Sequence, residues 1–414
     1  MGEAFKKNEF LKNLSVLVGG TALSQLINIV ALPILTRLYS PEEFGVLASY
    51  LGLVTIFVTV ASLRLEVAIP LPSCNNVAIN LAVLSMSCVV IISSLVGLVS
   101  LYLINARVWL PENLMLLVYF IPLSIFLHGL LNILQFWTSR EKKYVLLARS
   151  KVVSNTFGVA GKVSVGVYNF GVQGLVFGQL LQHFVGIAML ALNFLYEVKA
   201  RLNSITLKSL KRAFIEYHRF PKYSMWEAFA SIAGMQVPIL MIASYAEADA
   251  GYLALAIQLL SVPMALVGAS AAQVFIVQAS DKRVDGGLYL FTVKTAVMLA
   301  KIGLFPLLLA ALILPYVIPI IFGKEWAQVG AITSWLVPCY LLQFIVSPVS
   351  MSLHIIGKQI KALLLQILGL VLRVGGVAVA IFVAEGSVIP VYAISSAVFY
   401  FVFLIVVLYE VKGN

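Results

Sequence analysis

Charged and metal-binding residues are scarce in this chain of 414 residues. Only 11% of the residues are charged, and there are three cysteines and four histidines. The cysteines, Cys74, Cys88 and Cys339, lack CxxC spacing and the histidines are scattered along the chain. These features exclude a disulfide framework, and no metal site is expected. A soluble domain of this length would need a more charged surface, so an ordinary soluble fold is excluded as well.

Apolar residues fill the chain instead. They make up 61% of it, and the mean hydropathy is +1.02. Runs of about 18 or more apolar residues, each long enough to cross a hydrocarbon core, recur throughout. The sequence therefore predicts an all-α polytopic membrane protein with about twelve transmembrane helices, at residues 14–36, 44–63, 78–104, 112–137, 146–168, 171–195, 223–245, 250–277, 288–313, 328–352, 361–383 and 388–409.

The basic residues test this division, because lysine and arginine gather in the cytoplasmic loops of membrane proteins. Every second loop is basic, with Lys142 and Lys143 in one and Lys282 and Arg283 in another. The opposite loops hold only Arg37, Arg107 and Lys324. Both termini are therefore predicted to be cytoplasmic. The net charge of +11 reflects topology, and nucleic acid is not an expected partner.

Two six-helix halves are expected, at residues 1–198 and 223–414. The segment between them, 199–222, has apolar and basic residues on different helical faces, which is the pattern of an amphipathic interfacial helix. It is interpreted as a cytoplasmic linker rather than a regulatory element. The halves also resemble each other, because Phe44–Ala48 aligns with Ala250–Ala254 when Gly45 is set against Gly251. Internal duplication is common in transporters.

Polar side chains recur at helical spacing within several predicted spans. The most regular stripe runs through the fourth span and another through the fifth. Packing between helices through small and amide side chains is one explanation, and a hydrated cavity is the other. Several stripes together favour the cavity. The uncharged candidates for substrate binding have amide or imidazole side chains. They are Gln25, Asn28, His128, Asn132, Gln135, Asn155 and Gln366.

Six basic residues fall inside predicted spans. Arg149, Lys151 and Lys294 lie near the cytoplasmic ends, where snorkelling to the headgroups explains them. Lys162, Lys301 and Arg373 lie deeper, and each would cost roughly 2.5 to 3.5 kcal/mol if it faced lipid. All six are candidate substrate-binding residues, and the deeper three are expected to face a wet interior.

Carboxylates are nearly absent from the spans. Only Glu66 and Glu227 are candidates, near the cytoplasmic ends of their spans, and they are the predicted sites of any ion coupling. A pathway rich in cations and poor in acids suits an anionic substrate such as a lipid phosphate. No P-loop or HExxH motif occurs, so transport is predicted rather than catalysis, and no catalytic residue or metal ligand is assigned.

Several motifs resemble a known family in order and spacing. They are Leu32–Gly45 after the first span, Trp137–Tyr144, Gly174–Gly178, Phe220–Tyr223 and Phe322–Trp326. They are similar to those of Wzx-type flippases for O-antigen and other polysaccharides. These flippases belong to the multidrug/oligosaccharidyl-lipid/polysaccharide exporter superfamily. The resemblance covers essentially the whole chain, but the family has no strict catalytic motif, so it assigns no essential residue.

The resemblance implies two pseudo-symmetric six-helix bundles forming a V-shaped central cavity. It implies a lipid-linked oligosaccharide on undecaprenyl pyrophosphate as substrate, flipped across the bacterial inner membrane. No cofactor is expected, although H⁺ or Na⁺ would serve as coupling ion, and the expected partners are membrane lipid and other polysaccharide assembly proteins. Two alternatives remain open: a cation-coupled drug or small-molecule exporter of the same superfamily, and a polytopic polysaccharide polymerase or ligase.

Overall fold

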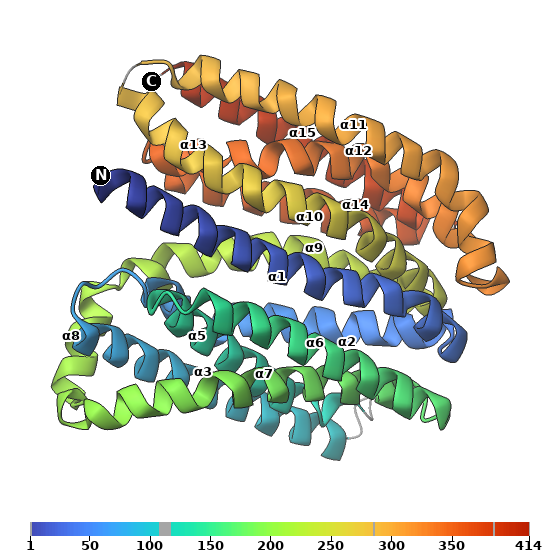
Figure 1. The fold of residues 1–414 in the computed structure, drawn as a ribbon. Coiled ribbons are helices and arrows are strands. Elements are labelled where there is room, and N and C mark those ends of the chain that lie inside the picture. Colours follow the sequence, from blue (N-terminus) through green and yellow to red (C-terminus); the bar gives the residue numbers. More distant parts are fainter. Residues whose placement is uncertain (1, 107–116, 285, 384–385, 414) are drawn as a thin grey trace. The chain divides into compact units, whose positions relative to one another are not determined.

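The computed structural model of the protein describes residues 2–106, 117–284, 286–383 and 386–413. Helices joined by short connections make up almost all of this part (Figure 1). Within it, the prediction of an all-helical protein with about twelve long helices is confirmed. The long helices are α1 (Gly2–Leu38), α2 (Pro41–Ala61), α3 (Asn75–Asn105), α5 (Ile121–Arg140), α6 (Tyr144–Val167), α7 (Val172–Ala200), α9 (Met225–Tyr245), α10 (Glu247–Val284), α11 (Leu288–Ile321), α12 (Gln328–Val349), α14 (Gln359–Val383) and α15 (Val388–Lys412).

Ten of these helices are long and apolar enough to cross a membrane within the described residues. The other two, α6 and α10, have 24 and 38 residues. At about 1.5 Å per residue, both are also long enough to cross a hydrocarbon core of roughly 30 Å. Helix α6 is the less apolar of the two, because it carries Arg149, Lys151 and Lys162.

The fourth predicted span, 112–137, differs from the helix found there. Residues 112–116 lie outside the described residues, and the described helix α5 begins at Ile121 and ends at Arg140. Pro122 explains the start, because proline has no N–H to satisfy and its fixed φ suits the first helical turn.

The chain forms two compact units. Unit 1 contains Met1–Leu38 and Tyr50–Phe229, and unit 2 contains Tyr39–Ser49 and Ala230–Asn414. In unit 1, α6 packs against α1 and α7, and α5 packs against α7 and α3. In unit 2, α14 packs against α9 and α15, and α12 packs against α15 and α11. The same packing order in both units shows that they are structural repeats of each other.

The two glycines of the proposed repeat meet inside unit 2. A Cβ added to Gly45 would lie 1.8 Å from the carbonyl oxygen of Glu247, and a Cβ added to Gly251 would lie 1.9 Å from that of Pro41. Each glycine thus faces the residue four positions before the other one. Only glycine permits so close an approach, because any Cβ would overlap the opposing backbone. The short sequence match therefore marks a symmetric helix crossing.

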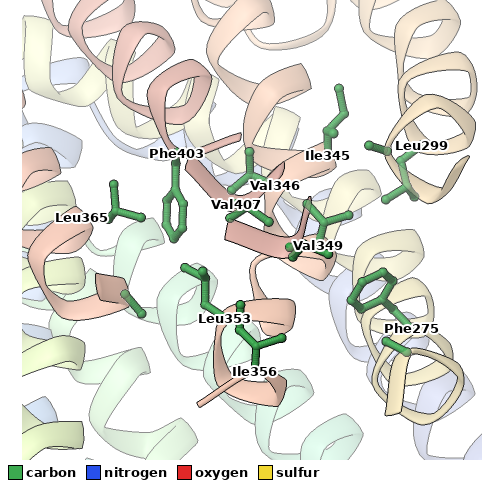
Figure 2. Packing of buried hydrophobic residues seen from close by; sticks show 14 of the residues in the cluster. Phe275, Leu299, Ile345, Val346, Val349, Leu353, Ile356, Leu365, Phe403 and Val407 are labelled. Carbon is green, nitrogen blue, oxygen red and sulfur yellow. The ribbon is translucent and has the colours of Figure 1, made fainter. Parts of the chain in front are cut away.

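Unit 2 also contains a large apolar core. Figure 2 shows side chains from several of its helices gathered there, among them Phe275 of α10, Val346 of α12 and Phe403 of α15. Leu353, from the short helix α13 (Met351–Ile355), is fully buried in the same cluster. Because Ala362 and Leu365 of α14 belong to this core, it holds α14 and its polar residues in a fixed orientation.

The predicted linker contains one short helix, α8 (Leu207–Glu216). Thr206 caps its N-terminus by accepting a hydrogen bond from the Ser209 N–H, and the Ser209 hydroxyl accepts one from Thr206 in return. Asn80 of α3 holds the helix in place: its side-chain oxygen accepts a hydrogen bond from the Ser209 hydroxyl at 3.2 Å, and its amide nitrogen donates to the Ser204 carbonyl at 3.3 Å. Leu207 is 87% exposed, which suits a helix that lies at a membrane surface.

The orientation predicted from the basic loops has a direct test. Cys74 is exposed beside the start of α3, and Asn203 is exposed in the linker. We expect that an impermeant maleimide applied to intact cells will not label Cys74 or a cysteine at Asn203, because both lie on the predicted cytoplasmic side. A Gln173→Cys variant, at the exposed opposite end of unit 1, should react. Labelling of Cys74 with protection of Gln173→Cys would reverse the topology.

Candidate functional site

A polar cluster lies inside unit 1, between helices that are otherwise apolar. Asn155 of α6 is buried, and its amide nitrogen donates to the Ser24 carbonyl of α1 at 3.0 Å and also to the Ser24 hydroxyl. Gln182 of α7 donates in turn to the Asn155 side-chain oxygen. Three helices are thus tied together through one amide. Such a network is stable in an apolar environment only because each buried polar group has a partner.

Lys162 lies two turns further along α6. Its ammonium donates to the side-chain oxygen of Gln179 at 3.4 Å, and the Gln179 amide nitrogen lies 3.4 Å from His183 Nε2. His183 is 5% exposed, and its ring stacks on that of His128 with 4.6 Å between centroids. Unit 1 therefore holds a cation, an amide and two imidazoles in one connected group.

Glycine explains how Lys162 reaches this position. A Cβ added to Gly178 of α7 would lie 2.3 Å from the Lys162 side chain and 2.6 Å from the Gly158 carbonyl oxygen. The absence of a side chain at Gly178 leaves the room through which the lysine stem passes. Gly158 and Gly161 face α7 from the other side, so α6 and α7 approach closely here.

The other polar candidates of unit 1 are less closely connected. Lys151 donates to the Thr21 hydroxyl at 3.2 Å, one turn of α6 before Asn155. Arg149 is exposed. Four further candidates are partly buried: Gln25, Asn28, Asn132 and Gln135.

Unit 2 buries one cation deeply. Arg373 of α14 is 2% exposed, and its guanidinium lies over the Phe399 ring at 4.3 Å and the Tyr400 ring at 5.0 Å. Its Nη2 atom has no hydrogen-bond partner. Gly234 of α9 leaves space for the head group, because a Cβ there would lie 3.2 Å from Nη1. Stacking on aromatic faces lowers the cost of burying the charge but supplies no negative partner.

Lys162 and Arg373 occupy corresponding positions in the two units. Asn155, Gly158 and Lys162 follow one another at the same spacing as Gln366, Gly369 and Arg373, a shared pattern of amide, glycine and cation. The helices that carry them, α6 and α14, are equivalent in the packing order of the units. In each unit the glycine faces the next long helix, and the cation lies one turn beyond it on the same face.

Lys301 and Lys294 are placed differently. Both are exposed on α11, on a helical face that includes Val297, Met298 and Phe305, which are 48%, 51% and 72% exposed. No contact brings either lysine to Arg373. Gln366 is partly buried on α14, two turns before Arg373.

The two acidic candidates lie at the ends of spans. Glu66 is 4% exposed in the one-turn helix Leu65–Ala68 between α2 and α3, where it accepts a hydrogen bond from Ser62 and lies 3.8 Å from Arg64. Burial raises the pKa of the Glu66 carboxyl group. Glu227 is partly buried in the first turn of α9. Among the described residues, no group of three or more His, Cys, Asp or Glu is arranged to hold a metal ion.

Within the polar cluster of unit 1, three residues of α7 were not predicted from the sequence: Gln179, Gln182 and His183. Their spacing on α7 places them on one face, which is the same signal that identified the other polar stripes. The aromatic residues around Arg373 carried no such signal, because the chain has 24 phenylalanines and 17 tyrosines distributed over most of its length.

Comparisons with known proteins agree with this architecture. The sequence profile of the family described as polysaccharide biosynthesis protein matches residues 34–331. No curated protein sequence matches the chain. Among solved structures, an inward-facing multidrug resistance MATE family transporter of the MOP superfamily has a TM-score of 0.70 and 17% identity, over 94% of this chain and 95% of that chain.

Two further solved structures are similar. A mutant of the Vibrio cholerae MATE transporter VcmN has a TM-score of 0.62 and 14% identity, over 100% of this chain and 98% of that chain. The eukaryotic MATE transporter AtDTX14 has a TM-score of 0.60 and 14% identity, over 96% and 94% of the two chains. Identities this low show a common fold of two pseudo-symmetric helical bundles, and they leave the substrate open.

Proposed function

Because the chain belongs to the polysaccharide biosynthesis protein family, we propose that it is a flippase for a lipid-linked oligosaccharide. The substrate would be an O-antigen or other surface-polysaccharide repeat unit carried on undecaprenyl pyrophosphate. Translocation would run from the cytoplasmic to the periplasmic leaflet of a bacterial inner membrane, by alternating access, with both termini in the cytoplasm. The MATE-like fold supports membrane transport as the general activity.

The observation that carries this proposal is a cation inside each unit without acidic residues around it. No Asp or Glu occurs in Ser15–Leu38, α5, α6, α12 or α14, and α7 has none before Glu197. In the two other helices that contact Arg373, α9 has only Glu227 in its first turn, and α15 has only Glu410 near its end. A buried charge is costly unless another charge compensates it. Lys162 and Arg373 would obtain that compensation from an anionic substrate, and a pyrophosphate carries at least two negative charges. A cationic drug would meet repulsion at both residues.

The amides of unit 1 suit the sugar part of such a substrate. Asn155 and Gln182 each have donors and acceptors on one side chain, which matches the alternating donor and acceptor character of hydroxyl groups. Their hydrogen bonds to each other and to Ser24 hold them in fixed orientations before a ligand arrives. We further propose that transport is coupled to H⁺ or Na⁺ and that the protein needs no cofactor.

Complementation distinguishes this function from drug export. Expressed in a strain that lacks its own flippase for a short lipid-linked repeat unit, the protein should restore surface polysaccharide. It should leave the resistance of a drug-hypersensitive strain to cationic dyes unchanged. The opposite pair of results, dye resistance without polysaccharide, would favour a small-molecule exporter. Equal membrane abundance in both strains, measured with a C-terminal tag, makes the two assays comparable.

A further inference from the structure

One side of the linker helix α8 packs against the protein, and the opposite side is open. The packed side contains Ala213, which is buried, and Ser209, whose hydroxyl donates to the Asn80 side chain of α3. Leu207 and Ile215 lie on the other side of the helix and are 87% and 59% exposed. Two large apolar side chains therefore lie on an open face of α8.

Three basic side chains share this open face. At about 3.6 residues per turn, Lys211 falls between the two apolar side chains, and Lys208 and Arg212 fall just beyond Ile215. All three are exposed, and in the described part of the chain no ion pair holds any of them. Glu216 is the only acidic residue of the linker. We call this set the basic face of α8: Leu207, Lys208, Lys211, Arg212 and Ile215.

The asymmetry of basic loops does not by itself explain this face. A topology signal needs basic residues on the cytoplasmic side of a span, at any position in the loop. It does not require them to share a helical face with large exposed apolar side chains. Lys142 and Lys143, for example, lie in and beside a tight turn between α5 and α6. In the linker, by contrast, the capping box at Thr206 fixes a helix, and the helix sets the order of cations and apolar groups.

The attachment of α8 to α3 places the basic face at the level of the lipid headgroups. Helix α3 begins at Asn75, and Asn80, which holds α8, lies in its second turn. At about 1.5 Å per residue, that is roughly 8 Å from the beginning of the span. Amphipathic helices bury their apolar face about 5–10 Å into the headgroup region. Figure 1 shows α8 running crosswise to α3, as a helix along a membrane surface does.

We infer that the basic face of α8 binds anionic phospholipids, of the phosphatidylglycerol class, in the membrane that surrounds the protein. The three cations bind the phosphate groups, and Leu207 and Ile215 insert between the headgroups. A zwitterionic lipid binds less well, because its own amine already offsets the charge of its phosphate. The ligand is a membrane lipid, so the inference does not depend on the transported substrate proposed above.

The depth of α8 in two bilayers tests the inference. A nitroxide spin label is attached at Ile215→Cys in full-length protein that also carries Cys74→Ser, and unlabelled background from Cys88 and Cys339 is measured without Ile215→Cys. The protein is placed in nanodiscs of phosphatidylcholine, alone or with an equal part of phosphatidylglycerol. Collisions with oxygen and with a water-soluble nickel complex report the depth of the label.

The label should lie deeper when phosphatidylglycerol is present. Each basic residue near an anionic surface strengthens binding about fivefold, so oxygen contact should increase and nickel contact should decrease. High salt should reverse the change, because it screens the charges.

A double variant, Lys211→Gln with Arg212→Gln, removes two cations of the basic face. Glutamine forms helices about as well as lysine and arginine, so α8 itself should be kept. This variant should lose most of the difference in depth between the two bilayers. The matched control is Lys324→Gln with Lys412→Gln, two exposed lysines of unit 2 whose loss changes the net charge by the same amount. The control should keep the difference.

Three results would overturn the inference. A label that stays in water in both bilayers would show that the basic face does not reach the lipid, as expected if it binds an acidic protein instead. Equal depth in both bilayers would make α8 an interfacial helix held by its apolar side chains alone. Loss of the difference in the control as well would assign the effect to net charge rather than to this face.

Discussion

Replacing Arg373 by methionine should abolish most transport and at the same time stabilise the protein. The guanidinium is 2% exposed, and its Nη2 has no hydrogen-bond partner. Removing one charged contact to a bound anion costs on the order of 1.5–3 kcal/mol, so surface polysaccharide should fall roughly ten- to a hundredfold. The free protein loses a buried charge without an acidic partner, which should raise its free energy of unfolding by on the order of 1 kcal/mol.

These opposite changes distinguish a binding residue from a structural one. Polysaccharide display is measured in the flippase-null strain, and thermal stability in detergent. Lys208→Met is the matched control, because it removes an exposed cation of the linker helix α8 and changes the net charge by the same amount. It should change neither quantity. Full display by Arg373→Met would remove the main support for an anionic substrate. Loss of display together with loss of stability would make Arg373 structural.

Lysine should substitute only partly for Arg373. Charge alone would predict near-normal activity for Arg373→Lys. The guanidinium, however, lies over the Phe399 and Tyr400 rings, and this arrangement depends on its flat shape. Lysine keeps the charge but has no plane to stack and carries a more strongly hydrated head group. An intermediate display, between wild type and Arg373→Met, would separate the contribution of charge from that of shape.

The fold could be predicted largely from the sequence because its causes are local. A run of apolar residues and a basic loop each identify a span without knowledge of its neighbours. The symmetric crossing at Gly45 and Gly251 left only a short match in sequence, because the glycines are constrained by each other and the residues around them are free to differ. The beginning of α5 was not predicted, because the apolar residues continue across Tyr119 and Phe120 without a break in composition; Pro122 was the sequence signal that marked it.

The sequence predicts how deep each basic residue lies in the membrane, but not which side of its helix the residue faces. Lys301 and Arg373 both lie near the middle of their helices, but Arg373 is 2% exposed and Lys301 is exposed. Depth follows from residue number at about 1.5 Å per residue. Rotation about the helix axis is decided by packing against other helices. Gly369, one turn before Arg373, marks the face that packs, whereas Phe305, one turn after Lys301, is 72% exposed.

Alanine at Gly251 or Gly45 should destabilise unit 2. A Cβ would lie 1.9 or 1.8 Å from an opposing carbonyl oxygen, far inside van der Waals contact. Carbonyl oxygens of helical residues cannot move alone, so α2 and α10 would have to separate along this crossing. Overpacking of this kind costs about 1–3 kcal/mol and sometimes more. We expect either variant to lower the midpoint of thermal unfolding and the amount of protein recovered from membranes.

Gly375→Ala is the matched control for this crossing. Gly375 also lies within a long helix, and a Cβ there would meet nothing within 4 Å. Alanine at that position should be neutral or stabilising, by up to about 1 kcal/mol, because glycine is the poorer helix former. Because each glycine faces the residue four positions before the other, both substitutions damage the same contact, and the double variant should be less destabilised than the sum of the singles. Normal stability of Gly251→Ala would show that the crossing opens at little cost, and the close approach would then not be what holds the first turns of α2 against α10.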